Sequence, residues 1–74
     1  MSELLIGCRG TVTVPTRGAD GAGEVLVSFG GGSETFLAYS EEPLRQGTAV
    51  VVYEVRGGRR VLVTPLEPQD NTGG

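Results

Sequence analysis

The sequence contains no histidine and no lysine, and these two absences exclude much of enzyme chemistry. Without histidine there is no Ser-His-Asp or Cys-His nucleophile system and no imidazole ligand for a metal ion. Without lysine there is no Schiff base and no P-loop lysine to hold a phosphate. The single cysteine, Cys8, excludes a disulfide within the chain and a multi-thiolate metal site built from one chain. We therefore expect a binding or structural module, not an enzyme, with no metal and no cofactor.

Long apolar runs are also missing from the sequence. No run approaches the roughly 20 apolar residues of a membrane span, and Leu4–Ile6 is too short for a signal peptide. The 74 residues are enough for one domain with a small core, which favours association with another copy or with a partner. We expect a soluble protein with a domain at residues 1–66 and a disordered tail at residues 67–74.

Glycine and alternating apolar residues are what the sequence has in abundance. Thirteen glycines and four prolines separate runs rich in Val, Thr, Phe and Tyr, in which apolar and polar residues alternate. Period-two alternation is typical of strands with one buried face. The sequence therefore predicts an all-β protein with strands at residues 7–14, 24–29, 33–39, 48–56 and 59–64.

Three of these segments carry more specific expectations. In the first strand, Cys8, Val12 and Val14 share the side that we expect to be buried. The strand at 48–56 is apolar on both sides, so both of its faces should be covered. Residues 40–47 should form a loop, which can contain one helical turn with Ser40 as its N-cap.

The Gly57-Gly58 pair fits a two-residue hairpin loop, because both central residues of a type I′ turn have positive φ. A three-residue loop with a bulge is the alternative and would exchange the two faces. We prefer the shorter loop. It pairs Arg56 with Arg59, Glu54 with Val61 and Val52 with Val63.

Five short strands in so small a chain favour a closed barrel, because closure removes exposed strand edges. An OB-type barrel and an SH3-like barrel both fit. The long connection at 40–47, with the apolar Leu44, favours the OB type, in which a helix or its remnant plugs one end of the barrel.

Two segments resemble the NfeD-like C-terminal domain family. In residues 47–66 a glycine leads into a Val-rich strand, a glycine turn and an apolar closing strand, and residues 7–18 combine spaced glycines, an alternating strand and a proline before the first loop. The resemblance covers most of residues 7–66 and implies a five-stranded OB-fold domain. It also implies a protein partner among the stomatin- or flotillin-type membrane scaffold proteins, and a cytoplasmic location peripheral to the membrane.

Several other features have plain structural explanations. The glycine-rich stretch at 30–33 leads into a strand and not into the helix that a phosphate loop needs, so we expect a hairpin turn. Residues 18–24 lack the ligand spacing of a calcium loop and should form a surface loop. Glu41 and Glu42 are adjacent on a loop and should be solvated charges, not an acid/base pair.

The candidate contact residues are apolar side chains left over once one face of each strand is filled, together with three arginines around one hairpin tip. Like charges at such a tip are relieved by an acidic partner or by lipid headgroups, or by pairing with Glu54 or Glu67 within the chain. The predicted partner-binding residues are Phe36, Leu37, Tyr39, Leu44, Arg56, Arg59 and Arg60.

Single-stranded nucleic-acid binding is the main alternative function for an OB barrel, and it requires aromatic platforms and a basic groove. Phe29 shares the buried side of its strand, the second and third strands carry Glu24 and Glu34 but no arginine, and the net charge is −3. This composition makes nucleic-acid binding unfavourable. A self-associating structural subunit is the third alternative.

Overall fold

The computed structural model describes residues 2–66, which form five strands and two short 3-10 turns. In chain order the elements are η1 (Ser2–Leu5), β1 (Arg9–Val14), η2 (Gly18–Asp20), β2 (Gly23–Phe29), β3 (Gly32–Tyr39), β4 (Ala49–Arg56) and β5 (Arg60–Pro65). The all-β prediction is confirmed. The predicted tail at residues 67–74 lies outside the described residues.

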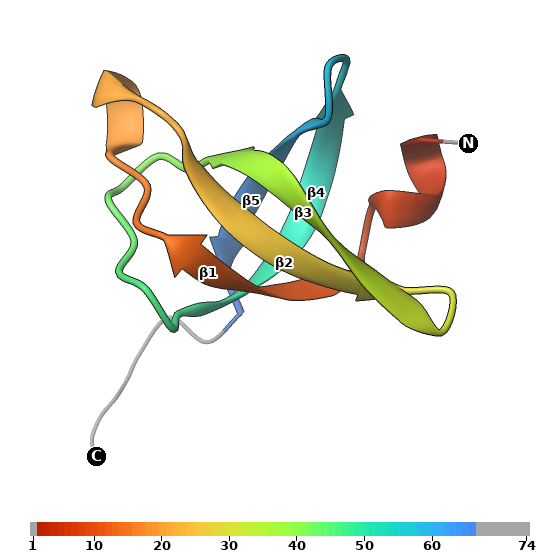
Figure 1. Ribbon diagram of the computed structural model, residues 1–74. Helices are drawn as coiled ribbons and strands as arrows, with labels where there is room; N and C mark the ends of the chain where they lie inside the picture. Colours follow the sequence, from red (N-terminus) through yellow and green to blue (C-terminus); the bar gives the residue numbers. More distant parts are fainter. Residues whose placement is uncertain (1, 67–74) are drawn as a thin grey trace.

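The five strands close into a barrel in the order β1-β2-β3-β5-β4, with β4 pairing back onto β1 (Figure 1). Among the described strands, β3 and β5 form a parallel pair and the other neighbours are antiparallel. This order, with its parallel β3–β5 pair, is the Greek-key arrangement of the OB type. The OB prediction is therefore confirmed, and the SH3-like alternative is rejected.

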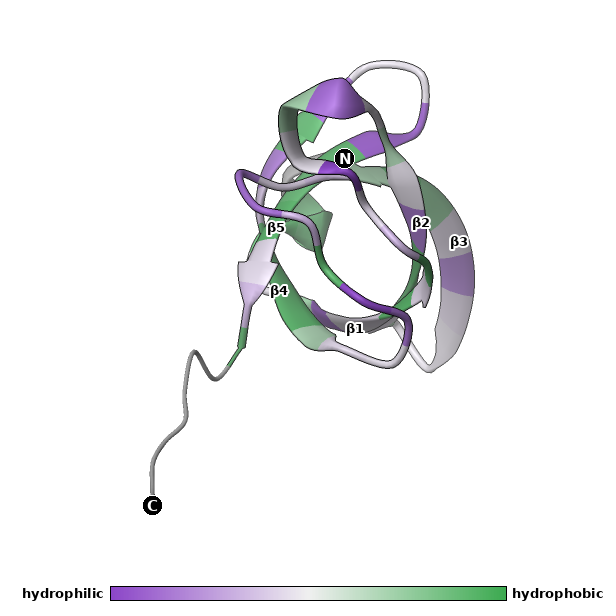
Figure 2. Ribbon diagram, turned by 90° about the vertical axis from the view of Figure 1, so that its left-hand side faces the viewer, coloured by the Kyte–Doolittle hydropathy of each residue, from purple (hydrophilic) through white to green (hydrophobic). Residues whose placement is uncertain are grey.

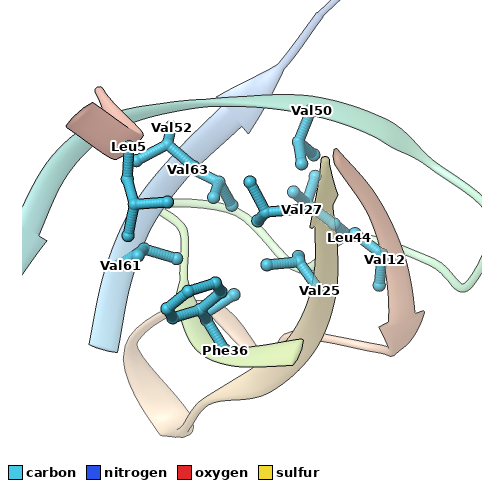
Figure 3. Packing of buried hydrophobic residues seen from close by; sticks show 11 residues of the cluster. Leu5, Val12, Val25, Val27, Phe36, Leu44, Val50, Val52, Val61 and Val63 are labelled. Carbon is cyan, nitrogen blue, oxygen red and sulfur yellow. The ribbon is translucent and has the colours of Figure 1, made fainter. Parts of the chain in front are cut away.

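The core of the barrel consists mainly of valines that alternate inward along the strands (Figure 3). Phe36 and Ala38 come from β3, while Leu5 of η1 and Leu44 of the 40–47 loop enter from outside the strands. The valines are Val12, Val25, Val27, Val50, Val52, Val61 and Val63.

Two expectations about burial are wrong, and both errors arise where β-bulges shift the register. The pairing of β1 with β2 shifts between Val12 and Val14, so Val14 turns outward and is 45% exposed. The pairing of β4 with β5 shifts between Val52 and Glu54, and the extra residue, Tyr53, is also exposed. The outer face of β4 is therefore not covered by the described residues. Cys8 is half-buried and packs against the core.

Residues 40–47 form a loop, as predicted, but the helical turn that the sequence allowed there is not formed. Ser40 does not cap a helix; its hydroxyl donates to the Glu42 carbonyl at 2.6 Å and lies 2.7 Å from the Thr16 hydroxyl. The Leu44 N–H donates to the same Thr16 Oγ1 at 2.8 Å. Thr16 and Ser40 are buried, and their hydroxyls bond to the Glu42 carbonyl and to the N–H of the buried Leu44. These bonds hold Leu44 against the core.

The two hairpins differ in loop length. Gly30 and Gly31, both with positive φ, make the predicted tight turn between β2 and β3. Between β4 and β5 the loop has three residues, because Arg56 pairs with Arg60 and Arg59 adopts a φ of 60°. The predicted pairs Arg56 with Arg59 and Glu54 with Val61 are therefore wrong. The pair Val52 with Val63 is right, because the bulge at Tyr53 offsets the extra loop residue.

Candidate interaction surface

The bulge in β4 and the parallel β3–β5 pair arrange outward side chains from three strands into two rows. The first row crosses the sheet from Leu37 to Arg60 to Arg56, and the second from Tyr39 to Leu62 to Glu54. Their neighbours in sequence, such as Ala38 and Val61, face the core. We call this surface the β3–β5–β4 face; its residues are Leu37, Tyr39, Glu54, Arg56, Arg60 and Leu62.

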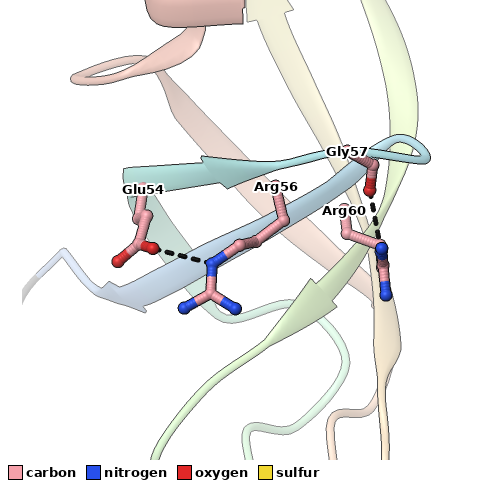
Figure 4. A network of polar contacts seen from close by, with 4 residues as sticks. All are labelled: Glu54, Arg56, Gly57 and Arg60. Atoms are coloured by element: carbon pink, nitrogen blue, oxygen red, sulfur yellow. Dashed lines mark hydrogen bonds and ion pairs between the residues drawn. The ribbon is translucent and has the colours of Figure 1, made fainter.

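Two of the three hairpin arginines have acidic partners within the chain. Arg56 Nε donates to Glu54 Oε2 at 2.7 Å (Figure 4), which is one of the pairings expected from the sequence. Arg59 Nη2 donates to Glu34 Oε1 at 3.0 Å. Glu67, the other expected partner, lies outside the described residues. The hairpin is therefore less basic than its arginine count indicates.

Arg59 has a further structural role at the hairpin. Its Nη2 also donates to the Thr35 carbonyl at 3.1 Å, and its guanidinium carbon lies 4.8 Å from the centroid of the Phe36 ring. Its own carbonyl accepts the Leu37 N–H at 3.0 Å. These contacts offset the positive φ of Arg59 and attach the hairpin to β3.

The predicted contact residues fall into two groups. Leu37 is 41% exposed and Tyr39 is half-buried, and both share the β3–β5–β4 face with Arg56 and Arg60. Phe36 and Leu44 are only 7% exposed and belong to the core, so the expectation that they lie outside it is wrong. Phe36 faces inward with Ala38 on β3, and the hydroxyl of Thr16 holds Leu44 inward.

A groove of about 460 Å³ lies beside the end of β5, and no pattern in the sequence predicts it. Leu44 and Val63 contribute apolar floor, and the bulge residue Tyr53 forms part of one wall. Glu41 and Glu42 stand on the loop side, and neither forms an ion pair within residues 2–66. We call this the acidic groove; it is lined by Ser40, Glu41, Glu42, Leu44, Tyr53, Val63, Thr64 and Pro65.

The described residues contain no candidate for a membrane-spanning helix or for a metal site. No helix within the described part of the chain is long and apolar enough to cross a membrane. Across the same residues, no group of three or more His, Cys, Asp or Glu side chains could hold a metal ion.

The hydropathy colouring in Figure 2 shows polar and apolar segments alternating around the barrel wall.

The fold and the surface define a small OB-type barrel with a mixed apolar and charged outer face. The family model of the NfeD C-terminal domain matches residues 9–64, so the chain belongs to this family, and the resemblance in the sequence is confirmed. A comparison with curated proteins finds no match.

Two solved structures are similar to the chain. The soluble domain of the NfeD protein YuaF from Bacillus subtilis is 31% identical with a TM-score of 0.73, over 92% of this chain and 80% of that one. The C-terminal domain of the stomatin operon partner protein 1510-C from Pyrococcus horikoshii is 25% identical with a TM-score of 0.68, over 88% of this chain and 92% of that one.

Proposed function

We propose that this domain is a non-enzymatic interaction module for a membrane scaffold protein of the stomatin or flotillin type. The observation that carries the proposal is the similarity to a domain of a protein described as a stomatin operon partner, over nearly the whole of both chains. Scaffold proteins of this type are attached to membranes, so the proposal places the domain in the cytoplasm, at the membrane periphery.

The β3–β5–β4 face is the surface that we propose for this contact. Leu37 and Tyr39 supply apolar and aromatic area on the strand beside Arg60, and tyrosine and arginine are residue types in which binding hot spots are enriched. Arg59 contributes indirectly, since its bonds to β3 hold the hairpin next to Leu37.

The outer surface of β2 and β3 is a poor match for the alternative, a site for single-stranded nucleic acid. Phe36 faces the core and Phe29 is half-buried, with their ring centroids 6.4 Å apart, so neither ring is an open stacking platform. Glu24 and Glu34 lie on these two strands, and Arg59, which contacts β3 from the β4–β5 turn, is paired with Glu34.

Substituting Leu37 with aspartate should weaken capture of the partner at least about tenfold, because it places a charge at the centre of the proposed contact. The measurement is capture of a purified stomatin-type protein from the same organism on the immobilised domain. Leu37→Asp/Tyr39→Asp should lose capture entirely.

Leu26→Asp is the matched control, because Leu26 is 40% exposed on the outer surface of β2, the strand next to the proposed face but outside it. It should bind as the wild type does. Unchanged capture by Leu37→Asp/Tyr39→Asp, or an equal loss with Leu26→Asp, would contradict the proposed surface.

A further inference from the structure

The acidic groove continues the β3–β5–β4 face toward the end of β5. The face begins at the hairpin with Arg60, passes Leu62 in the second row and reaches Thr64 at the groove. Arg60 and Thr64 are four positions apart along the strand, which corresponds to a distance of about 13 Å. In Figure 1 the β4–β5 turn is at the top, and the end of β5 is near the bottom. One continuous surface therefore has a hairpin end and a groove end.

The two ends carry opposite charge that no ion pair within residues 2–66 neutralises. At the groove end, Glu41 and Glu42 are exposed and form no ion pair within the described residues, and Arg45 of the same loop does not line the groove. At the hairpin end, Arg60 pairs with no described carboxylate. Its Nε donates to the Gly57 carbonyl at 2.7 Å (Figure 4), and the two glycines before Arg59 have no side chains to shield it.

The middle of the surface is apolar and only partly covered. Tyr53 is 45% exposed, and Tyr39 and Leu62 are half-buried. Leu37, which is 41% exposed, lies beside Arg60 at the hairpin end. On β4, Arg56 lies beside Arg60 at the hairpin end and Glu54 lies beside Leu62, and these two side chains neutralise one another. The order along the surface is therefore basic, apolar and acidic.

We propose that two copies of this chain pair through this surface about a two-fold axis near Leu62. A two-fold axis reverses the direction of the second copy, so that Arg60 of each copy meets Glu41 and Glu42 of the other, and the apolar middle covers itself. Each guanidinium then lies beside an exposed Tyr53 ring, which favours a cation through its π face. Two-fold dimers are by far the commonest protein assemblies, and a self-complementary patch is what they require.

This dimer does not depend on the stomatin-type partner, because it involves the purified chain alone. It covers the face proposed for that partner, so the two contacts compete. The two proposals can fail independently. The molecular mass in solution tests the dimer, and capture of the purified partner tests the stomatin-type contact.

Sedimentation equilibrium of the wild-type domain and two charge variants tests the dimer. At about 10 mM salt, where charges act over about 30 Å, the wild-type mass should rise with concentration to twice the monomer mass and no further. Glu41→Lys/Glu42→Lys should remain monomeric, and so should Arg60→Glu, because each places like charges together at both ends. None of these three side chains packs in the core, and the hydrogen bond of Arg60 to Gly57 lies within one exposed turn, so the fold should be kept.

A mixture of the two variants is the decisive sample. In a mixed pair, one contact joins lysines to glutamate and the other keeps the wild-type charges, so the mixture should form dimers although neither variant does alone. Asp20→Lys and Arg9→Glu reverse exposed charges outside the surface and should dimerise as the wild type does. A wild type that stays monomeric at about 1 mM, a mixture that does not dimerise, or a mass above that of a dimer overturns the proposal.

Discussion

Replacing Gly23 with alanine should cost about 3 kcal/mol or more of unfolding free energy and leave much of the domain unfolded at 25 °C. Gly23 begins β2 and is buried where the end of β1 crosses it. A Cβ there would overlap the carbonyl oxygens of Val14 and Pro15. These are backbone atoms that cannot rotate away, so the strain exceeds the usual cost of overpacking. The loss of unfolding free energy is measured by urea denaturation followed by circular dichroism.

Gly32→Ala is the matched control for this substitution. Gly32 begins β3, its φ is not in the left-handed region, and a Cβ there would meet nothing within 4 Å. Alanine at this position should be neutral, or stabilising by up to about 1 kcal/mol, because it restricts the unfolded chain. Equal stability of the two variants would mean that β1 and β2 do not cross as closely as the structure has them.

Replacing Phe36 with alanine should cost about 3–5 kcal/mol, since it removes a buried ring from a small core. A domain of this size has only a few kcal/mol of stability to lose. The variant should also lose the contact with Arg59 that attaches the hairpin to β3. Thermal unfolding should show no cooperative transition above room temperature.

Phe29→Ala serves as the comparison, because this ring neighbours Phe36 but is only half-buried. Phe29→Ala should lower the free energy of unfolding by clearly less than Phe36→Ala does. The sequence alone predicted Phe36 to be a contact residue, and in that case Phe36→Ala would fold normally and fail only in partner capture. A folded Phe36→Ala domain would therefore contradict the core that the structure shows.

The strands could be predicted from the sequence because their signal is local. Val25 and Val27 share one side of their strand while Glu24 and Ser28 lie on the other, and the structure buries both valines. The glycines at 30 and 31 predict their turn in the same way, since a tight hairpin needs positive φ. The periodicity of the residues and the chemistry of the turns were therefore enough to predict the strands of the barrel.

The bulges and the burial of Leu44 in the 40–47 loop could not be predicted from the same signals. A bulge inserts one residue into a strand that otherwise alternates normally, so nothing local indicates that Val14 or Tyr53 turns outward. The position of Leu44 depends on a hydrogen bond to Thr16, 28 residues away in the chain. The acidic groove results from both features, which is why the candidate site was only partly predicted.

The central claim is that this NfeD-family barrel presents its β3–β5–β4 face to a stomatin-type partner. The most direct measurement is a map of amide chemical shifts of the labelled domain, at a concentration where it is monomeric, as the purified partner is added. We expect the shift changes to gather on residues 37–39 and 60–62 and to leave the β1–β2 surface around Leu26 unchanged. Changes centred on β1 and β2, or no changes at saturating partner, would contradict it.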